Sequence, residues 1–434
     1  MKKVACVIPP LYRLIESKNN RITISMHYLA EILHRRGHEV IYINGDYADD
    51  SLSYCDRLSM TKNSWLFDVR YEKGHISYDE VMDILHKFQP DVVIIGAGDV
   101  LMPTVELGSP QSCAYMAKQV REKLGNEIIC VGYGHLLRYA NKEEIKNLDV
   151  IITGEGEEDI VDVVENNLRG ELPEKWITDM DALPILTDSY IYQQYRPEDM
   201  DYIMSMRGCG HRCIFCQQPS LRGNRVAMMS AKRFVKEVRY RIEHFGTTDF
   251  YFSDPVFIPN YSDRTRKMLE LLIQLKKEYP DFMWRSEARI DTIINHSSFA
   301  GQMYESGCRH LKLGVEMLNA DMLAYIQKDI TPEQAMAAFQ ICRRTGIETT
   351  AYVLLGCPGF QDKDYQDMWK YFRDLQANNY VINITVPYQG TELYGRMDHY
   401  LHEKGLYKDG EEGFSHISLV MKDFWNISDE TLAL

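Results

Sequence analysis

The sequence predicts an α/β protein built from two successive parallel-sheet units. Short runs rich in β-branched residues alternate with helical patterns from residue 1 to about 170, and again from residue 201 to about 395. Strands that alternate with helices form parallel sheets covered by helices. The 434 residues exceed the length of roughly 250 to 300 at which one core stops growing. With 45% hydrophobic and 26% charged residues, the composition is that of a globular protein.

Five strand-like runs organise the N-terminal part, residues 1–170. They read VACVIPP, EVIYI, DVVIIGAG, EIICVGYG and DVIITGEG. After the first run, Met26, Leu29 and Leu33 recur at helical spacing and Gly37 follows as a helix stop. These units predict a Rossmann-like, doubly wound parallel sheet. Residues 46–77 interrupt the rhythm with a polar and aromatic insertion containing Trp65 and Phe67, which predicts a lid or interface element.

The rest of the chain predicts a linker, a second α/β unit and a short extension. Residues 171–200 carry prolines among mixed charges without periodicity, which indicates a linker packed across a surface. Between residues 201 and 395, six strand-like runs read YIMSMRG, DFYFSD, MWRSEAR, HLKLGVE, TTAYVLLG and YVINITVP. Helical stretches separate them, at 231–245, 262–279, 332–345 and 362–377. Residues 396–434 are too few for a third domain of normal size.

Charge and hydropathy exclude two classes of partner. The chain has 49 Lys and Arg against 63 Asp and Glu, a formal charge of -14 that repels phosphate backbones. No apolar run approaches the roughly 18 to 20 residues that cross a bilayer, and the start MKKVACVIPP lacks the features of a signal peptide. We therefore expect a cytoplasmic protein with neither a nucleic-acid nor a membrane partner.

Three of the ten cysteines lie within eight residues, at Cys209, Cys213 and Cys216. In a reducing compartment this spacing indicates metal or redox chemistry rather than disulfides. Three thiolates on one loop suit a [4Fe-4S] cube that leaves one iron open for a further ligand. The alternative is structural zinc with His211 as fourth ligand. Structural zinc sites draw ligands from two separate pairs, and the chain contains no second CxxC, so the sequence favours the cluster.

A CxxxCxxC motif after the first strand of a six-fold α/β repeat resembles the radical S-adenosylmethionine (SAM) superfamily. Cys209, Cys213 and Cys216 match its cluster ligands, and Phe215 matches the aromatic residue before the third cysteine. The resemblance implies a partial (β/α)6 radical SAM barrel over residues 201–395. It also implies a [4Fe-4S] cluster that binds SAM and cleaves it to methionine and a 5'-deoxyadenosyl radical. The electron would come from flavodoxin, ferredoxin or a separate reductase.

The same resemblance assigns SAM contacts to residues at the ends of later strands. Ser253 stands where the family binds the amino group of SAM, although the usual Gly-Gly-Glu form is absent. Glu316 resembles the ribose and carboxylate contacts. Gly356 and Pro358 resemble the adenine-contacting turn.

The candidate catalytic residues are Asp254, Glu287 and Arg289, which also follow predicted strands. Folds of this kind place their active sites at the C-terminal ends of the strands. Together with Glu316, these charged groups predict a small polar substrate such as a sugar or amino sugar. The alternative for Glu287, Arg289 and Glu316 is a structural ion pair inside the barrel.

The N-terminal part resembles the cobalamin-binding domain that precedes many such barrels. The similar segments are PPLYR, HYLAEILHRRGHEV, PDVVIIGAG and DVIITGEGEEDIVD. The resemblance implies cobalamin contacts at Gly96, Gly132, Gly154, Glu155 and Gly156, because glycines at strand ends let a ligand approach the backbone. The alternative for the Gly-Glu-Gly-Glu run is a strand-to-helix turn with acidic residues that needs no ligand.

Three departures from the cobalamin-domain pattern bear on that assignment. The DxHxxG motif is absent, so no histidine from it would ligate cobalt. Tyr133 stands where the family has a Gly-Gly pair, and Leu101 and Met102 replace small polar residues. If these three side chains fill the cleft, the domain is a scaffold.

Two enzymatic functions remain. The first is cobalamin-dependent methylation of an unactivated carbon, in which SAM supplies both the methyl group and the radical. The second is cobalamin-independent dehydration or deoxygenation of an amino sugar, as in the aminoglycoside diol dehydratases that retain a vestigial cobalamin domain. A non-enzymatic cobalamin carrier has no use for the three cysteines.

Overall fold

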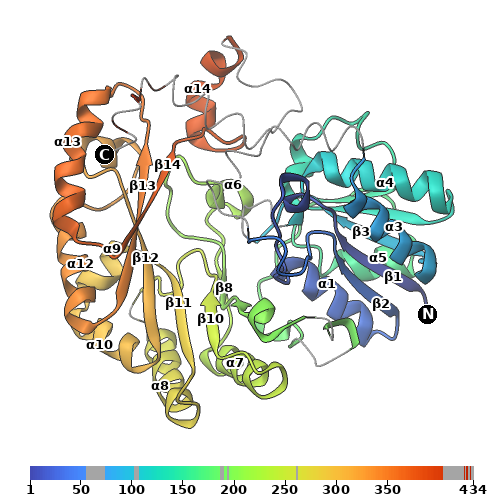
Figure 1. The fold of residues 1–434 in the computed structure, drawn as a ribbon, viewed down its shortest axis with the longest axis horizontal. Coiled ribbons are helices and arrows are strands. Elements are labelled where there is room, and N and C mark those ends of the chain that lie inside the picture. The colour runs from blue at the N-terminus through green and yellow to red at the C-terminus, as the bar shows by residue number, and fades with distance from the viewer. Residues whose placement is uncertain are drawn as a thin grey trace. The chain divides into compact units, whose positions relative to one another are not determined.

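The structure is a computed structural model of the 434-residue chain. It describes residues 1–54, 74–101, 107–185, 190–192, 195–260 and 262–403, and the single residues 425, 427, 428 and 431. Trp65 and Phe67 of the predicted insertion lie outside the described residues, as does Met102. The chain divides after Met200 into two compact units, which are blue to green and green to red in Figure 1.

The first unit is built on a six-stranded parallel sheet with the order β2-β1-β3-β4-β5-β6. Its strands are β1 (Lys3–Ile8), β2 (Glu39–Asn44), β3 (Val92–Gly96), β4 (Ile129–Tyr133), β5 (Val150–Ile152) and β6 (Gly170–Glu171). The strand order reverses at β1, as in doubly wound sheets, where ligands bind beyond the strand ends at the reversal point. The predicted sheet is confirmed, with β6 as an added two-residue strand.

Helices cover the first sheet: α1 (Ile24–Arg35), α3 (Ile76–Phe88), α4 (Pro110–Leu124) and α5 (Asp159–Glu165). Side chains alternate along a strand, so Ala5 and Val7 of β1 share one face, and they enter the same core as Leu85 of α3 and Val120 of α4. The helix α1 packs against α5. Gly37, with a φ of +87°, follows α1 as the sequence predicts.

The segment predicted as a linker packs on the first unit. Its side chains Ile191 and Tyr192 are buried. The hydroxyl of Tyr192 donates to the carbonyl of His27 at 3.4 Å, and the amide of Ile22 donates to the carbonyl of Asp199 at 3.2 Å. Residues 171–200 therefore extend the first unit rather than separating it from the second.

The second unit holds a six-stranded parallel sheet in sequential order, β14-β13-β12-β11-β10-β7. Its strands are β7 (Tyr202–Ile203), β10 (Asp249–Phe252), β11 (Met283–Ala288), β12 (Cys308–Glu316), β13 (Glu348–Leu355) and β14 (Asn379–Ile384). All six predicted strands are present. Two short strands, β8 (Met206–Arg207) and β9 (Ala227–Met228), form a separate antiparallel pair.

Helices line the outer side of this sheet (Figure 1), namely α7 (Ala231–Phe245), α8 (Asp263–Glu278), α10 (Ser297–Glu305), α12 (Pro332–Thr345) and α13 (Asp362–Leu375). The second unit also contains α6 (Gln218–Arg222), α9 (Ile290–Asn295), α11 (Ala320–Tyr325) and α14 (Glu392–Glu403). Along β12, Leu311 and Leu313 are fully buried, whereas the alternate residues His310 and Lys312 are half-buried. The alternate residues therefore define an inner face that can meet a ligand.

Among the described residues, no helix combines the length and the apolar character needed to cross a bilayer.

Candidate active site

The three-cysteine loop lies between β8 and β9, whose pairing closes its base. Met206 pairs with Met228, and Arg207 pairs with Ala227. Gly208 begins the loop with a φ of +81°, and a Cβ there would lie 2.1 Å from the carbonyl oxygen of Arg225. Only glycine fits this position, because a side chain would collide with the backbone of the returning strand.

Backbone hydrogen bonds hold the middle of the loop on two sides. The amide of Ile214 donates to the carbonyl of Ile326 at 3.2 Å, and the amide of Leu393 donates to the carbonyl of Ile214 at 2.9 Å. The first bond comes from the end of α11 and the second from the start of α14. The loop is thus fixed before any ligand binds.

All three loop cysteines are free thiols, with Cys213 buried and Cys209 and Cys216 half-buried. Burial raises the pKa of Cys213, and burial raises the pKa of Cys216 to about 12; the neighbouring loop thiols add to both rises. The three thiols lie within eight residues of one loop. No three His, Cys, Asp or Glu side chains in the described part of the chain converge on one point as around a single ion. Since each cysteine of a cube binds a different iron, this donor set fits a [4Fe-4S] cluster.

Ser253 and Asp254 organise the backbone that leads into the loop. The Asp254 carboxylate accepts hydrogen bonds from the amides of Ser205 and Met206 at 2.6 and 2.9 Å, and from the Ser205 hydroxyl. The Ser253 hydroxyl donates to the carbonyl of Ile203 at 3.2 Å. Burial raises the pKa of Asp254 to about 6. The structure thus gives both residues backbone partners, and their roles toward SAM and in catalysis stay predictions.

Glu287 belongs to a polar chain on the inner face of the sheet. The Tyr251 hydroxyl donates to Glu287 at 3.0 Å, and the Lys312 ammonium donates to the Tyr251 oxygen at 3.1 Å. Burial, followed by the nearby Glu287 carboxylate, raises the pKa of Tyr251 well above its usual value. Sequence reasoning missed Tyr251 and Lys312; period-two alternation on β10 and β12 is the signal that could have placed them on this face.

Arg289 and Glu316 each form an ion pair. This is the geometry expected if these residues have a structural role rather than a ligand-binding one. Arg289 Nε lies 3.0 Å from Asp291, and Glu316 lies 2.6 Å from the Lys328 ammonium. Lys328 was also missed, because it lies in a turn between α11 and α12 that carries no recognisable motif. Whether Arg289 and Glu316 also contact a ligand stays a prediction.

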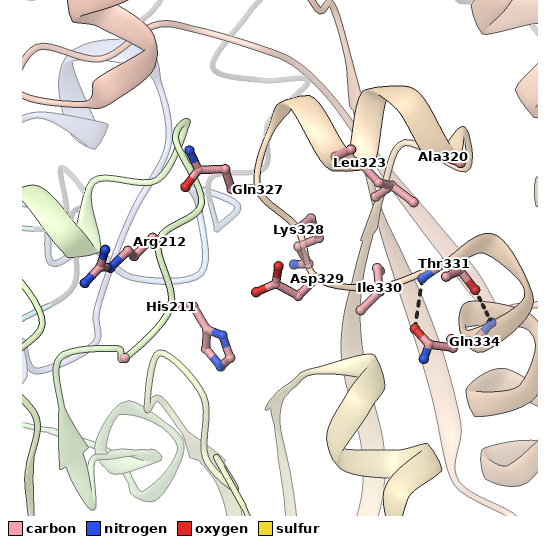
Figure 2. A pocket seen from close by; sticks show the side chains of 12 residues that line it. His211, Arg212, Ala320, Leu323, Gln327, Lys328, Asp329, Ile330, Thr331 and Gln334 are labelled. Atoms are coloured by element: carbon pink, nitrogen blue, oxygen red, sulfur yellow. Dashed lines mark hydrogen bonds between the residues drawn. The ribbon is translucent and has the colours of Figure 1, made fainter.

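A pocket of about 830 Å³ adjoins the cysteine loop. Figure 2 shows His211 and Arg212 of the loop on one side and Lys328 with Asp329 opposite them. Burial lowers the pKa of His211, and the Arg289 guanidinium adds to the effect. The neutral form of His211 is therefore favoured at this wall of the pocket.

The predicted adenine turn is covered by an aromatic ring. Gly356 has a φ of +104°, and a Cβ there would lie 2.4 Å from the indole of Trp425. The Trp425 indole N–H donates to the carbonyl of Thr385 at 2.9 Å. Pro358 is half-buried, as is Phe215 on the cysteine loop. Their contacts with SAM stay predictions.

Three glycines predicted to contact cobalamin pack closely against the protein itself. A Cβ on Gly96 would lie 2.3 Å from the carbonyl oxygen of Leu107, and one on Gly132 would lie 2.5 Å from Leu148. A Cβ on Gly154 would lie 3.0 Å from the backbone of Lys175. These glycines allow close packing of the protein, and their contacts with cobalamin stay predictions.

Tyr133 fills space beside the same strand ends. It is fully buried, and its hydroxyl donates to the carbonyl of Glu155 at 3.0 Å. Glu155 in turn accepts from the amide of Ile177 at 2.7 Å, and a Cβ on Gly156 would lie 3.1 Å from the Tyr133 ring. Leu101 is buried as well. The packing of Tyr133 and Leu101 matches the scaffold alternative, and the cobalamin contacts of Glu155 and Gly156 stay predictions.

Residues 203–372 match the family model of the Radical SAM superfamily. The chain is 24% identical over 343 residues to an uncharacterized methyltransferase of Pyrococcus horikoshii, covering 74% of this chain and 72% of that protein. It is 23% identical over 417 residues to the hopanoid C-3 methylase of Methylococcus capsulatus, covering 90% and 72%.

A solved structure shares the fold: the radical SAM methyltransferase TsrM of Kitasatospora setae, with cobalamin and a [4Fe-4S] cluster bound. The TM-score is 0.64 at 15% identity, over 92% of this chain and 75% of that one. TsrM has also been solved with its tryptophan substrate and a SAM analogue. The predicted combination of a cobalamin-domain-like unit with a radical SAM barrel is thus confirmed as a fold. The similarity to the radical SAM superfamily that the cysteine spacing predicts thus extends over residues 203–372.

Proposed function

We propose that the protein uses a [4Fe-4S] cluster on Cys209, Cys213 and Cys216 to cleave SAM and start radical chemistry on a small substrate. The observation that carries the proposal is a loop of three free thiols anchored by backbone bonds on both sides of Ile214. A bound cluster would supply the electron that splits SAM into methionine and a 5'-deoxyadenosyl radical. A fixed loop holds the ligands in place without reorganisation.

The inner face of the second sheet supports a small polar substrate such as a sugar or amino sugar. Tyr251, Glu287 and Lys312 form one hydrogen-bonded chain there. A ligand hydroxyl or amine can exchange hydrogen bonds with these groups, whereas an apolar ligand would cover them without replacing their bonds to water. These three hydrogen-bonded side chains would orient the substrate for hydrogen abstraction.

Methyl transfer to an unactivated carbon is the reaction that the comparisons favour. The two sequence relatives are named as methyltransferase and methylase, and the structural neighbour TsrM holds cobalamin. Cobalamin would carry the methyl group. The second candidate is cobalamin-independent dehydration, which the packing of Tyr133 and of the three glycines favours. A cytoplasmic location and a flavodoxin or ferredoxin donor stay predictions.

The test is anaerobic reconstitution with iron and sulfide, followed by assay of 5'-deoxyadenosine. We expect about four irons per chain and SAM cleavage in the wild type, and loss of both in Cys213→Ala. Cys342→Ala is the matched control, because Cys342 is a fully buried thiol on α12 outside the loop. Zinc in place of iron, or cleavage by Cys213→Ala, would contradict the proposal.

A further inference from the structure

A buried ion pair stands beside the cysteine loop. The Lys328 ammonium lies 2.6 Å from the Glu316 carboxylate, and both side chains are 9% exposed. Burying two charges costs free energy, and removing either partner would leave the other charge buried without compensation. Figure 2 shows Lys328 on the side of the pocket that faces His211 of the loop.

The backbone on both sides of the pair is held in an uncommon conformation. Glu316 has a φ of +53° and Gln327, the residue before Lys328, has a φ of +55°. Neither is glycine, so each conformation costs free energy that its surroundings supply. A Cβ on Gly314 would lie 2.5 Å from the Glu316 carboxylate and 2.7 Å from the Lys328 ammonium, so the strand leaves room for the pair only because Gly314 has no side chain.

The turn that carries Lys328 is bonded directly to the loop. Ile326, two residues earlier, accepts the amide hydrogen bond of Ile214, which lies between the second and third cysteines. The Lys328 charge also lies close enough to Cys213 and Cys216 to lower the pKa of both thiols against the effect of burial. One backbone bond and one charge therefore link the pair to the cluster ligands.

Arg289, directly after β11, is a second buried cation held by a carboxylate. Arg289 is 5% exposed, its Nε is paired with Asp291 at 3.0 Å, and its Nη2 has no hydrogen-bond partner among the described residues. Its charge also acts on Cys213 and His211. Two buried cations, Lys328 and Arg289, therefore act on the Cys213 thiol, and each is held by a carboxylate.

We propose that Lys328, held in place by Glu316, is a buried positive charge that raises the reduction potential of the cluster on the cysteine loop. The inference rests on the proposed function, because it needs a cluster there. On reduction the cluster takes up one electron from a low-potential flavin or iron–sulfur donor, so its net negative charge grows by one. A fixed cation nearby stabilises that added charge, and net charge is a main determinant of cluster potential.

The experiment measures the midpoint potential of the reconstituted full chain by redox titration with dithionite, read by electron paramagnetic resonance. Lys328→Met is expected to reduce the equilibrium constant for reduction on the order of tenfold, a shift of about 59 mV to more negative potential for one electron. Lys328→Arg should stay near the wild type. Glu316→Gln removes a negative charge and should shift the potential in the opposite direction.

The opposite signs separate a charge effect from simple loosening of the site. A looser site admits water in both variants, which would move both potentials in the same direction and overturn the inference. Lys370→Met is the matched control, because it removes the same charge from the exposed outer helix α13. Unchanged potentials in a loaded Lys328→Met chain would also overturn it. Failure of the wild type to bind iron would instead refute the proposed function.

Discussion

At the scale of single residues, a buried carboxylate at a strand end need not be catalytic. Asp254 and Asp46 both follow strands, and both are buried. Asp46 accepts hydrogen bonds from the amides of Leu11 and Arg13 at 2.8 and 3.0 Å, as Asp254 does from residues 205 and 206. Sequence position alone cannot separate such a backbone-holding acid from one that meets a ligand, because both occupy the same end of the sheet.

We predict that Asp254 acts through the backbone it holds. Asp254→Ala removes three acceptor bonds at the entrance to β8 and should lower iron bound after reconstitution at least severalfold. Asp254→Asn should keep most of the iron, since one oxygen can accept both amides and the new amide can donate to the Ser205 hydroxyl. Iron content and 5'-deoxyadenosine yield check this together: full iron with no cleavage in Asp254→Asn would indicate a chemical role instead.

Asp46 predicts a pH dependence of stability in the first unit. Burial raises its pKa from 3.8 to about 7. Between these values the folded state keeps a proton that the unfolded chain has lost, so the free energy of unfolding falls as pH rises and levels off above about 7. Asp46→Asn lacks this loss and should be the more stable variant at pH 8, by on the order of 3 kcal/mol, with little difference at pH 4. Thermal unfolding across pH 4 to 8 measures it; a pH-independent difference would contradict the assignment.

At the scale of elements, the sequence predicted every strand of three or more residues and missed three strands of two residues, β6, β8 and β9. The helices predicted at 231–245 and 332–345 match α7 and α12 to the residue, because hydrophobic periodicity and caps mark both of their ends. The strands β8 and β9 have two residues each, too few for any period. They nevertheless form the base of the cysteine loop, so the sequence placed the ligands but not the element that holds them.

The β8–β9 pair makes Gly208 essential for the loop. A Cβ at this position would lie 2.1 Å from the Arg225 carbonyl oxygen, and an alanine would have to adopt a backbone φ of +81°. Gly208→Ala should therefore disrupt the pair and abolish iron binding, while the helical circular dichroism of the chain stays near the wild type. Gly210→Ala is the control in the same loop, because a Cβ there meets nothing within 4 Å. Equal iron loss in both variants would show that the loop tolerates no side chain at either position.

At the scale of the whole molecule, the sequence predicted two different parallel sheets in succession. It did not predict which groups surround particular glycines and lysines. Cysteine spacing is local, so it identified the cluster loop. Lys328 meets Glu316 only through a turn and a strand end 12 residues apart. A glycine that admits a ligand and one that admits Leu107 look alike in sequence, and only packing tells them apart.

Cobalamin binding separates the two candidate reactions. If the reaction is methyl transfer of the kind its relatives' names indicate, the chain mixed with hydroxocobalamin should elute from gel filtration with about one corrin, and methyl-labelled SAM should label the product. Because the backbone of Lys175 already covers Gly154, Gly154→Ala should lower the melting temperature by a few degrees and leave the corrin stoichiometry unchanged. Loss of corrin without a change in melting temperature would instead indicate that cobalamin contacts the backbone at Gly154. If the protein elutes without corrin and its activity does not respond to added cobalamin, the first unit serves as a scaffold. That outcome would favour dehydration.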